Sequence, residues 1–267
     1  ALTMSLNTKI TDWSKKRVWI IGASTGMGAA LADALHSRKA KVAMSARSAD
    51  KLAALVTKFG ASRAISLPLD ITKVETIAAA EKELIDAWGG YDLVVFMAGD
   101  YTAMRAWELD LKVAKQMVDV NWGGFLNGLS VVIPHFMASG VDGTRAGGIA
   151  LVSSVAGYRG LPKSLVYGPT KAALINLAET LYIDLKEKGL DVYVINPGFV
   201  KTPMTDKNDF KMPSLITPEE AALEIISGFE NGEFEIHFPK GFTRVMKVLR
   251  HLPYSLYFPA IKKSTKV

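Results

Sequence analysis

The heptapeptide Gly22-Ala23-Ser24-Thr25-Gly26-Met27-Gly28 decides the fold of this chain. It directly follows the short apolar run Val18–Ile21, and a segment of helical period continues from it to about Arg38. Glycine at three positions lets the backbone turn sharply between a strand and a helix and approach a ligand closely. The N-terminus of the following helix offers free N–H groups to phosphate. Because glycines also serve ordinary tight turns, it is the flanking strand and helix that indicate a nucleotide site.

Apolar runs of strand length alternate with longer segments of helical period along the rest of the chain. The next expected strands are Val42–Ser45, Ala64–Leu69, Leu93–Ala98, Ile149–Ser153 and Val192–Ile195, and the expected helices lie near 49–59, 73–88, 110–137 and 167–188. Phe234–Phe238 alternates apolar and polar side chains as an edge strand does, and Thr217 begins a further helix. Buried strands joined by helices predict an α/β fold with a doubly wound parallel sheet. With no linker and no internal repeat in the sequence, we expect a single Rossmann-like domain.

The composition excludes several classes of site. The 267 residues are 49% hydrophobic, which is enough for a sizeable core, and they include no cysteine. Disulfides, thiolate catalysis and cysteine metal sites are therefore excluded, and the four histidines lack metal-ligand spacing, so we expect no metal. No run approaches the roughly 18–20 apolar residues of a membrane-spanning helix, and no secretory signal pattern is present. These features favour a cytoplasmic location.

Positive charge is concentrated near the C-terminus. Seven of the 32 Lys and Arg residues, and no acid, fall in residues 236–267, whereas the rest of the chain balances 25 basic against 26 acidic residues. The net charge of +6 therefore gives no reason to expect nucleic-acid binding. We expect residues 1–14 to form a loose, partly disordered leader and 15–240 the nucleotide-binding domain. Residues 241–267, called the tail below, then form a basic amphipathic extension.

The glycine spacing G-x-x-x-G-x-G and the later Tyr167-Gly168-Pro169-Thr170-Lys171 resemble two signatures of the short-chain dehydrogenase/reductase family. The resemblance covers about residues 15 to 240, although Ile21 stands where the family turn has Thr. It implies an enzyme that transfers a hydride between NADP(H) and a carbonyl or alcohol substrate. A homodimer or homotetramer formed through the helices near 110–137 and 167–188 is implied as well.

The register of the Tyr-x-x-x-Lys signature selects its catalytic copy, because a second copy exists at Tyr182 and Lys186. The family places a Ser thirteen residues before its Tyr, and Ser154 holds that place for Tyr167, whereas Pro169 holds it for Tyr182. On a helix, residues four apart share a face, so Tyr167 and Lys171 can act together. Neighbouring Ser153 is the alternative to Ser154. We interpret Tyr182 as structural.

The resemblance implies a role for each member of the site. Tyr167 would give a proton to the carbonyl oxygen while Ser154 holds that oxygen. An isolated phenol has a pKa near 10, and the Lys171 ammonium, with the oxidised nicotinamide, is expected to lower it. Asn121 matches the fourth active-site residue, which positions a water linking the Lys to solvent. A purely structural polar contact is the alternative for Asn121.

The cofactor preference depends on the end of the second strand. An acid that would accept bonds from the ribose hydroxyls of NAD is absent there, and Arg47 could face a 2′-phosphate instead. We therefore expect NADP(H) rather than NAD(H), the alternative being that Arg47 is a solvated loop charge. Asp70 matches the adenine-binding acid of the family, although it could simply cap the next helix. The full set of expected cofactor-binding residues is Gly22, Ser24, Gly26, Met27, Gly28, Arg47, Asp70, Ile71, Ala98, Gly99, Tyr167, Lys171, Pro197, Gly198, Val200 and Thr202.

Two C-terminal regions are candidates for contact with the substrate and with a membrane. The segment 203–217 corresponds to the family's substrate loop, and an apolar substrate would contact Met204, Phe210, Met212, Leu215, Tyr158 and Leu161. In the tail, apolar residues recur at helical spacing from Phe242 to Leu252 with basic residues between them. That pattern is typical of a helix on a membrane surface, so we expect weak peripheral membrane contact through 242–267. Packing on a partner subunit or on the chain's own domain is the alternative.

Other functions fit parts of the pattern. A non-catalytic NADP-binding sensor or scaffold, with a membrane- or partner-binding tail, could use the same fold. It would have little reason to keep Ser154, Tyr167 and Lys171 at these spacings. A sugar-nucleotide epimerase or dehydratase of the extended family needs a larger C-terminal domain than the roughly 69 residues that follow Gly198.

Overall fold

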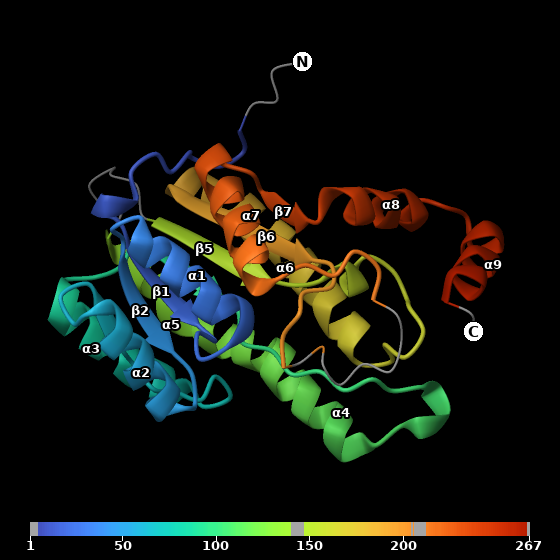
Figure 1. Cartoon of the computed structure of the whole chain (residues 1–267), viewed down its shortest axis with the longest axis horizontal. Helices are drawn as coiled ribbons and strands as arrows, with labels where there is room; N and C mark the ends of the chain where they lie inside the picture. Colours follow the sequence, from blue (N-terminus) through green and yellow to red (C-terminus); the bar gives the residue numbers. More distant parts are fainter. Residues whose placement is uncertain (1–4, 140–146, 204, 206–211, 266–267) are drawn as a thin grey trace.

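The computed structural model of the chain describes residues 5–139, 147–203, 205 and 212–265. Seven strands form one sheet in the order β3-β2-β1-β4-β5-β6-β7, and every neighbouring pair is parallel (Figure 1). The strands are β1 Arg17–Ile21, β2 Lys41–Ser45, β3 Ala64–Ser66, β4 Leu93–Phe96, β5 Gly147–Val152, β6 Leu190–Pro197 and β7 Glu235–Phe238. The expected α/β fold, a doubly wound parallel sheet in a single domain, is confirmed.

Helices cover both faces of the sheet. Those of at least eight residues are α1 Gly26–Ser37, α2 Ala49–Phe59, α3 Val74–Trp88, α4 Leu111–Val118, α5 Gly124–Ser139, α6 Tyr167–Leu185, α7 Pro218–Asn231, α8 Lys240–Arg250 and α9 Tyr254–Thr265. Short helical turns lie at Trp13–Lys15, Ala106–Glu108, Asp119–Gly123, Val155–Gly157 and Lys186–Lys188. One buried cluster joins the sheet to α3, α5 and α6, and a second joins it to α1, α2 and α7. The chain therefore has three layers.

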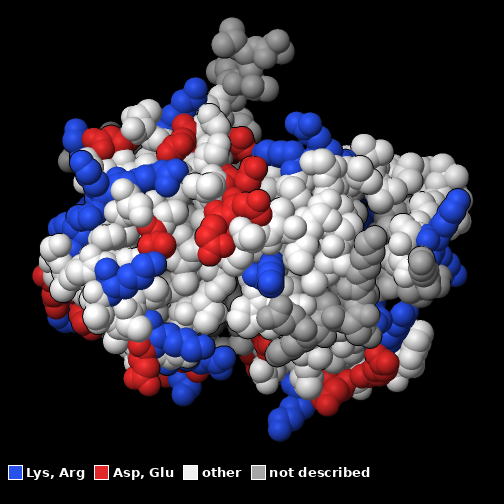
Figure 2. Space-filling view, in the orientation of Figure 1, with Lys and Arg blue, Asp and Glu red and all other residues white. Residues whose placement is uncertain are grey.

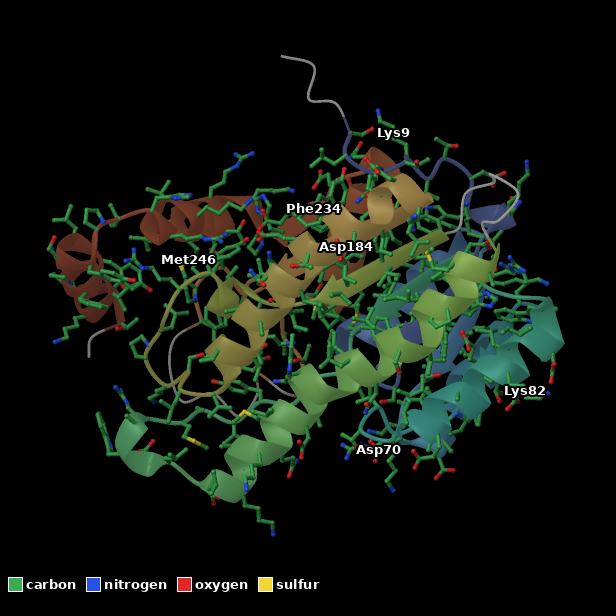
Figure 3. The ribbon with its side chains drawn as sticks, turned by 180° about the vertical axis from the view of Figure 1, so that it is seen from behind. Lys9, Asp70, Lys82, Asp184, Phe234 and Met246 are labelled. Carbon is green, nitrogen blue, oxygen red and sulfur yellow. The ribbon has the colours of Figure 1, made fainter. Side chains whose placement is uncertain are left out.

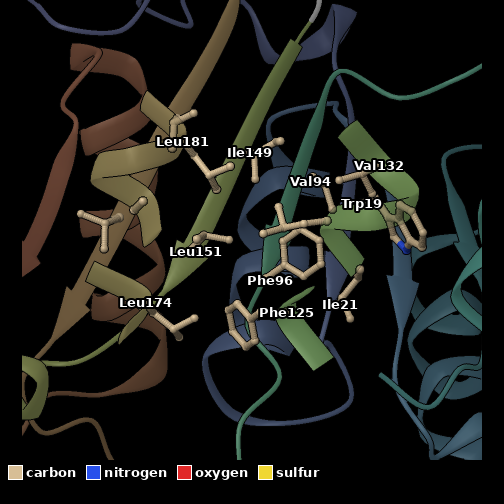
Figure 4. Close-up of a cluster of buried hydrophobic side chains, with 14 of the residues drawn as sticks. Trp19, Ile21, Val94, Phe96, Phe125, Val132, Ile149, Leu151, Leu174 and Leu181 are labelled. Carbon is tan, nitrogen blue, oxygen red and sulfur yellow. The ribbon is translucent and has the colours of Figure 1, made fainter. Parts of the chain in front are cut away.

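The central strands supply both layers because their side chains alternate between the faces. In β1, Trp19 and Ile21 belong to the cluster under α3, α5 and α6, whereas Val18 and Ile20 belong to the other cluster (Figure 4). All four side chains are at most 1% exposed. Continuous apolar runs, rather than alternating ones, are what strands buried on both faces require.

The order of the strands reverses at β1, which pairs with β2 on one side and with β4 on the other. The connections from these strands therefore leave in opposite directions. In open α/β sheets a crevice forms at such a point, beyond the carboxyl ends of the strands. The glycine-rich turn, the loop after β2 and the loop after β4 all start at this edge.

Some elements differ in extent from the sequence expectations. The strand expected at 64–69 ends at Ser66, and the one expected at 93–98 ends at Phe96. The helix expected over 110–137 is interrupted by a π-helical turn, Asp119–Gly123, between α4 and α5. The tail contains two helices, α8 and α9, rather than the single one expected from Phe242.

The N-terminal segment, expected to be a loose leader over residues 1–14, is anchored at Asn7 and Trp13, whereas most of its other described side chains are exposed. Asn7 is 2% exposed, and its side-chain amide donates to the carbonyl oxygens of Val192 (2.7 Å) and Glu233 (3.2 Å). Trp13 is buried, and its indole N–H donates to Glu230 (2.9 Å). These bonds fasten the segment to β6 and α7. Among the described residues, no helix is both long and apolar enough to span a membrane.

The Asn7 side chain also accepts a hydrogen bond from the N–H of Val192, so its replacement tests the packed segment. We expect Asn7→Ala to lower the free energy of unfolding by about 2 kcal/mol, because buried backbone groups lose their partners. Urea denaturation measures this difference. Asn231→Ala, at an exposed position in α7, is the matched control and should change the free energy by less than about 0.5 kcal/mol. Equal effects of the two substitutions would contradict a structural role for Asn7.

Candidate active site

A cleft of about 320 Å³ opens at the carboxyl edge of the sheet, where the strand order reverses. Eleven of the residues expected to bind the cofactor line it, namely Gly22, Ser24, Gly26, Met27, Gly28, Arg47, Asp70, Ile71, Ala98, Gly99 and Thr202. Other lining residues that the sequence did not single out include Thr25, Ser48, Asp100, Gln116 and Pro203. The expected residues from five separate loops, those after β1, β2, β3, β4 and β6, are thus brought together in one place.

The glycine-rich turn is closed so tightly that two of its glycines leave no room for a side chain. A Cβ on Gly28 would lie 2.0 Å from the carbonyl oxygen of Gly22. Gly22 has a φ of +106°, and a Cβ there would lie 2.5 Å from the backbone nitrogen of Ala98. Both glycines therefore serve contacts within the protein, between the turn, α1 and the loop after β4. Thr25 caps α1 without using its hydroxyl for that purpose, which leaves the hydroxyl at the cleft.

The outer end of the cleft carries Arg47, Ser48 and Asp70. One oxygen of Asp70 accepts bonds from the backbone N–H (3.0 Å) and the hydroxyl (2.8 Å) of Thr72. These bonds, and to a smaller extent the charge of Arg47, lower the pKa of Asp70. Asp70 thus closes the turn before α3, whose N-cap is Lys73, so the expected alternative of a direct helix cap does not hold. Ser48 precedes α2 and makes no capping bond with its side chain.

Ser154, Tyr167 and Lys171 come together from two segments that follow β5. Ser154 stands two residues after the end of β5, Tyr167 is the first residue of α6, and Lys171 lies one turn further along α6. The Ser154 side chain lies close enough to the Tyr167 hydroxyl to lower its pKa, and it accepts a hydrogen bond from the N–H of Ala156 (3.1 Å). The Lys171 ammonium donates to the carbonyl oxygen of Val152 (3.0 Å) and lies 5.6 Å from the centre of the Tyr167 ring. The spacing of thirteen residues thus places Ser154 near the Tyr167 phenol.

Neighbouring Ser153 is engaged elsewhere. Its hydroxyl donates to the backbone carbonyl oxygen of Lys171 (2.7 Å), and its side chain is buried. Ser153 thus fastens β5 to α6, whereas Ser154 lies near the Tyr167 hydroxyl. Of the two serines left open by the sequence, Ser154 is the one that influences the pKa of the Tyr167 phenol.

Burial controls the protonation of the two ionisable groups at this site. It raises the pKa of Tyr167 to about 12, against a smaller lowering by Ser154. It also lowers the pKa of Lys171 to about 8. In the chain alone, the loss of hydration at Tyr167 outweighs the effect of Ser154, and the Lys171 ammonium donates to Val152. The expected lowering of the Tyr167 pKa also included the positive charge of the oxidised nicotinamide, which belongs to the cofactor and not to the chain.

Asn121 lies in the π-helical turn and connects three parts of the site. Its side-chain oxygen accepts from the N–H of Asp100 (2.7 Å), and its amide donates to the carbonyl oxygen of Asp100 (2.8 Å). The same amide donates to the Thr170 hydroxyl (3.2 Å), which stands between Tyr167 and Lys171 on α6. Asn121 is fully buried. It thus ties the loop after β4, which lines the cleft, to the helix that carries the Tyr–Lys pair.

The segment after β6 contributes less to the cleft than expected. Thr202 lines it, and its methyl carbon would lie 3.0 Å from a Cβ at Gly26. Pro197, Gly198 and Val200 are not among the lining residues. A Cβ on Gly198 would lie 2.9 Å from the Phe242 ring, so this glycine permits contact with α8. Val200 is buried, and its carbonyl oxygen accepts a bond from the Thr205 hydroxyl (2.7 Å).

With this geometry established, comparison with known proteins identifies the family. The family profile described as short chain dehydrogenase matches residues 16–212, about three quarters of the chain. The chain belongs to the short chain dehydrogenase family, and so to the oxidoreductases.

Relatives of this short chain dehydrogenase extend over most of its length. It is 31% identical to an "uncharacterized oxidoreductase" of Myxococcus xanthus over 95% of this chain and 99% of that protein. A Listeria monocytogenes protein of the same description is 33% identical over 78% of this chain and 87% of its own length.

Solved structures share the fold of this short chain dehydrogenase. One from Burkholderia cenocepacia in complex with NADP has a TM-score of 0.79 at 23% identity and covers 96% of this chain and 100% of its own. One from Burkholderia phymatum in complex with NAD has a TM-score of 0.80 at 21% identity and covers 89% and 94%.

The second Tyr-x-x-x-Lys copy of this short chain dehydrogenase lies near the far end of α6. Tyr182 donates to the carbonyl oxygen of Leu6 (2.9 Å) and packs its ring against Phe234. Lys186 pairs with Asp191 (3.1 Å). These contacts hold the N-terminal segment and β6, which fits the interpretation of Tyr182 as structural.

The residues expected around the substrate are only partly brought together. Tyr158 is buried, and its hydroxyl donates to Glu235 (2.5 Å). Leu161 packs against the buried cluster, and Leu215 is 42% exposed. Met204 and Phe210 lie outside the described residues. Tyr101, which the sequence did not single out, meets the Tyr167 ring edge-on with 4.9 Å between the ring centres.

The buried Lys171 makes the stability of the short chain dehydrogenase depend on pH. Between pH 8 and 10 the lysine is largely neutral in the folded chain but charged in the unfolded chain. The contribution of Lys171 to the free energy of unfolding therefore rises with pH over this range. At pH 7 the charge is buried in the fold, and we expect Lys171→Met to raise the free energy of unfolding by up to about 3 kcal/mol. The gain should shrink as the pH approaches 10.

Urea denaturation of wild type and Lys171→Met at pH 7, 8, 9 and 10 measures this dependence. The exposed Lys112→Met is the matched control, and its difference from wild type should stay constant over the same range. A Lys171→Met difference that did not change with pH would show that the lysine keeps an ordinary pKa.

Proposed function

We propose that this oxidoreductase interconverts a carbonyl and an alcohol with NADP(H) as cofactor, and that Tyr167 is its acid and base. The observation that carries the proposal is the position of the buried Lys171 ammonium, 5.6 Å from the centre of the Tyr167 ring, with Ser154 near the Tyr167 hydroxyl. Asn121 fixes this group to Asp100 at the edge of the cleft. A non-catalytic sensor would have no use for a buried, costly ammonium at this position.

The cleft fits a dinucleotide. Two glycines keep the strand-to-helix turn compact, and Ser24 and Thr25 bring hydroxyls to the N-terminus of α1, where phosphate is favoured. When bound, the nicotinamide supplies or accepts the hydride. Solved neighbours carry both cofactor types, NADP in the Burkholderia cenocepacia protein and NAD in the Burkholderia phymatum protein. The preference of this chain therefore depends on its own residues at the outer end of the cleft.

Arg47 and Ser48 support NADP(H) over NAD(H). Arg47 is exposed and lines the cleft, and a guanidinium binds a phosphate with two parallel hydrogen bonds. The Ser48 hydroxyl is not used to cap α2 and can add a third donor. Asp70 stands in the same part of the cleft, but its carboxylate already accepts two bonds from Thr72.

The protonation of the site favours reduction of a carbonyl near neutral pH. With a pKa of about 12, Tyr167 keeps its proton and can give it to the carbonyl oxygen as the carbon receives the hydride. Ser154 donates to the same oxygen as charge develops there. Oxidation of an alcohol needs the phenolate, so it is favoured only at higher pH or when a bound positive charge lowers the pKa.

We further propose a cytoplasmic homodimer or homotetramer that associates through α4, α5 and α6. These helices expose large apolar side chains at Val118, Leu126, Met137 and Ile183. Exposed apolar side chains of this kind are what a subunit interface covers.

Tyr167→Phe removes the proton donor and leaves the ring in place. We expect kcat for a carbonyl substrate with NADPH to fall by roughly 100- to 10,000-fold, the usual contribution of a positioned acid. NADPH binding, followed by nicotinamide fluorescence, should weaken far less than kcat falls. Tyr182→Phe is the matched control at the second copy of the signature, and its kcat should stay within about twofold of wild type. Turnover that survived Tyr167→Phe would rule out the proposed acid.

Arg47→Ala tests the cofactor preference. Loss of a charged, two-pronged phosphate contact should lower kcat/KM for NADPH by roughly 10- to 100-fold and leave that for NADH nearly unchanged. Lys51→Ala, an exposed cation on the neighbouring helix α2, should change neither value. Equal losses with both cofactors would contradict a contact between Arg47 and the 2′-phosphate.

A further inference from the structure

The apolar side chains of the tail form two groups, one packed against the domain and one facing outward. Phe242, Met246 and Leu249 of α8 pack against the buried cluster, and Met246 points from α8 toward the body of the domain (Figure 3). In α9, Tyr257 and Ile261 are buried. The other large apolar residues of the two helices are outside, with exposed fractions of 57% for Val245, 66% for Val248, 68% for Tyr254, 58% for Leu256 and 55% for Phe258. Packing on the domain therefore uses only part of the apolar surface.

The same surface is positively charged. Residues 236–267 contain seven Lys and Arg residues and no acid. Lys240 and Lys247 are neutralised by Glu233 and Glu235 of the domain. Within the described parts of the chain, Arg244, Lys262 and Lys263 have no acidic partner, and all three are exposed. On the face seen in Figure 2, white and blue atoms cover the region of α8 and α9.

A latch centred on Arg159 holds α8 and α9 in place. Its guanidinium donates to three carbonyl oxygens at the end of α8, those of Leu249, Arg250 and Leu252. It also lies over the rings of Tyr254 and Tyr257, 4.7 and 4.0 Å from their centres. The Tyr257 hydroxyl donates to the carbonyl oxygen of Gly160 (2.6 Å). The exposed surface is thus preformed and fixed to the turn between Ser154 and Tyr167.

We propose that the outward faces of α8 and α9 form a docking surface for an anionic phospholipid bilayer. Apolar and aromatic side chains that alternate with Lys and Arg suit the boundary between acyl chains and headgroups. Each cation near an anionic leaflet adds to the attraction. Because the latch fixes the surface before binding, little ordering entropy opposes association.

A second copy of the chain fits this surface less well. In a twofold dimer the same patch meets itself, so the unpaired cations of one tail would face those of the other without an acid between them. Burial of such charges is unfavourable unless they are paired. An anionic lipid surface supplies the opposite charge that the tail lacks.

Co-sedimentation of the full-length protein with vesicles tests the proposal. We expect binding to vesicles of phosphatidylglycerol and phosphatidylcholine, weak binding to phosphatidylcholine alone, and a steep loss of binding as salt screens the charges. The double variant Lys262→Gln, Lys263→Gln should bind roughly 30-fold more weakly, at about 1 kcal/mol for each cation. Val248→Ser with Phe258→Ser should weaken binding to both vesicle types.

Matched variants elsewhere on the surface separate this site from nonspecific adsorption. Lys51→Gln with Lys112→Gln, and Val74→Ser with Leu223→Ser, replace exposed side chains of the same kinds and should leave binding unchanged. Circular dichroism and NADPH binding check that all variants are folded. Failure of wild type to bind, or equal losses in the tail and control variants, would overturn the proposal. So would a tail variant that changed the sedimentation coefficient of the free protein, because a second copy would then cover the surface.

Discussion

A steric constraint at the turn between β1 and α1 determines the geometry of the whole cleft. Gly28 lies so close to the carbonyl of Gly22, and Gly22 so close to the backbone of Ala98, that no side chain fits at either glycine. Helix α1 and the loop after β4 therefore pack against the same turn from two sides. The N-terminus of α1 is aimed into the space between β1 and β4 as a result. Ile21, which replaces the Thr of the family turn, is buried in the sheet, and its carbonyl oxygen accepts a hydrogen bond from the N–H of Met97 (2.8 Å) in the loop after β4.

The second half of the site depends on polar groups that are buried between the sheet and α6. Ser153 and Lys171 both bond to backbone carbonyl oxygens, across the junction of β5 and α6. Asn121 extends this network to the loop after β4 by way of Thr170 and Asp100. The π-helical turn accounts for the position of Asn121, because the extra residue in that turn allows a mid-helix amide to face backbone groups of another loop. The main effect of this network on Tyr167 is to fix its position, rather than to place a charge beside it.

The sequence predicts the sheet and the positions of most site residues well, because both depend on local pattern and spacing. The run Val18–Ile21 and the glycines after it define β1, the turn and α1, and the thirteen-residue spacing selects Ser154 over Ser153. The sequence does not show that burial raises the pKa of Tyr167 in the chain alone, since burial is a sum over neighbours distant in sequence. The packing of Asn7 was missed for the same reason, because its partners lie about 185 and 226 residues away. Tyr101 carried no recognisable signal, as its contact with Tyr167 depends on how two loops meet.

The bonds from Arg159 to the end of α8, and from Tyr257 to Gly160, join segments about 90 to 97 residues apart in the chain. Glu235 adds a second connection, since it binds Tyr158 on one side and Lys247 on the other. The turn after Ser154 and the tail therefore behave as one structural unit. In a chimaera with a relative, exchanging either segment alone would leave an arginine without carbonyl acceptors or a helix end without its cap. Recombination, in the laboratory or in evolution, keeps these contacts intact when it transfers both segments together.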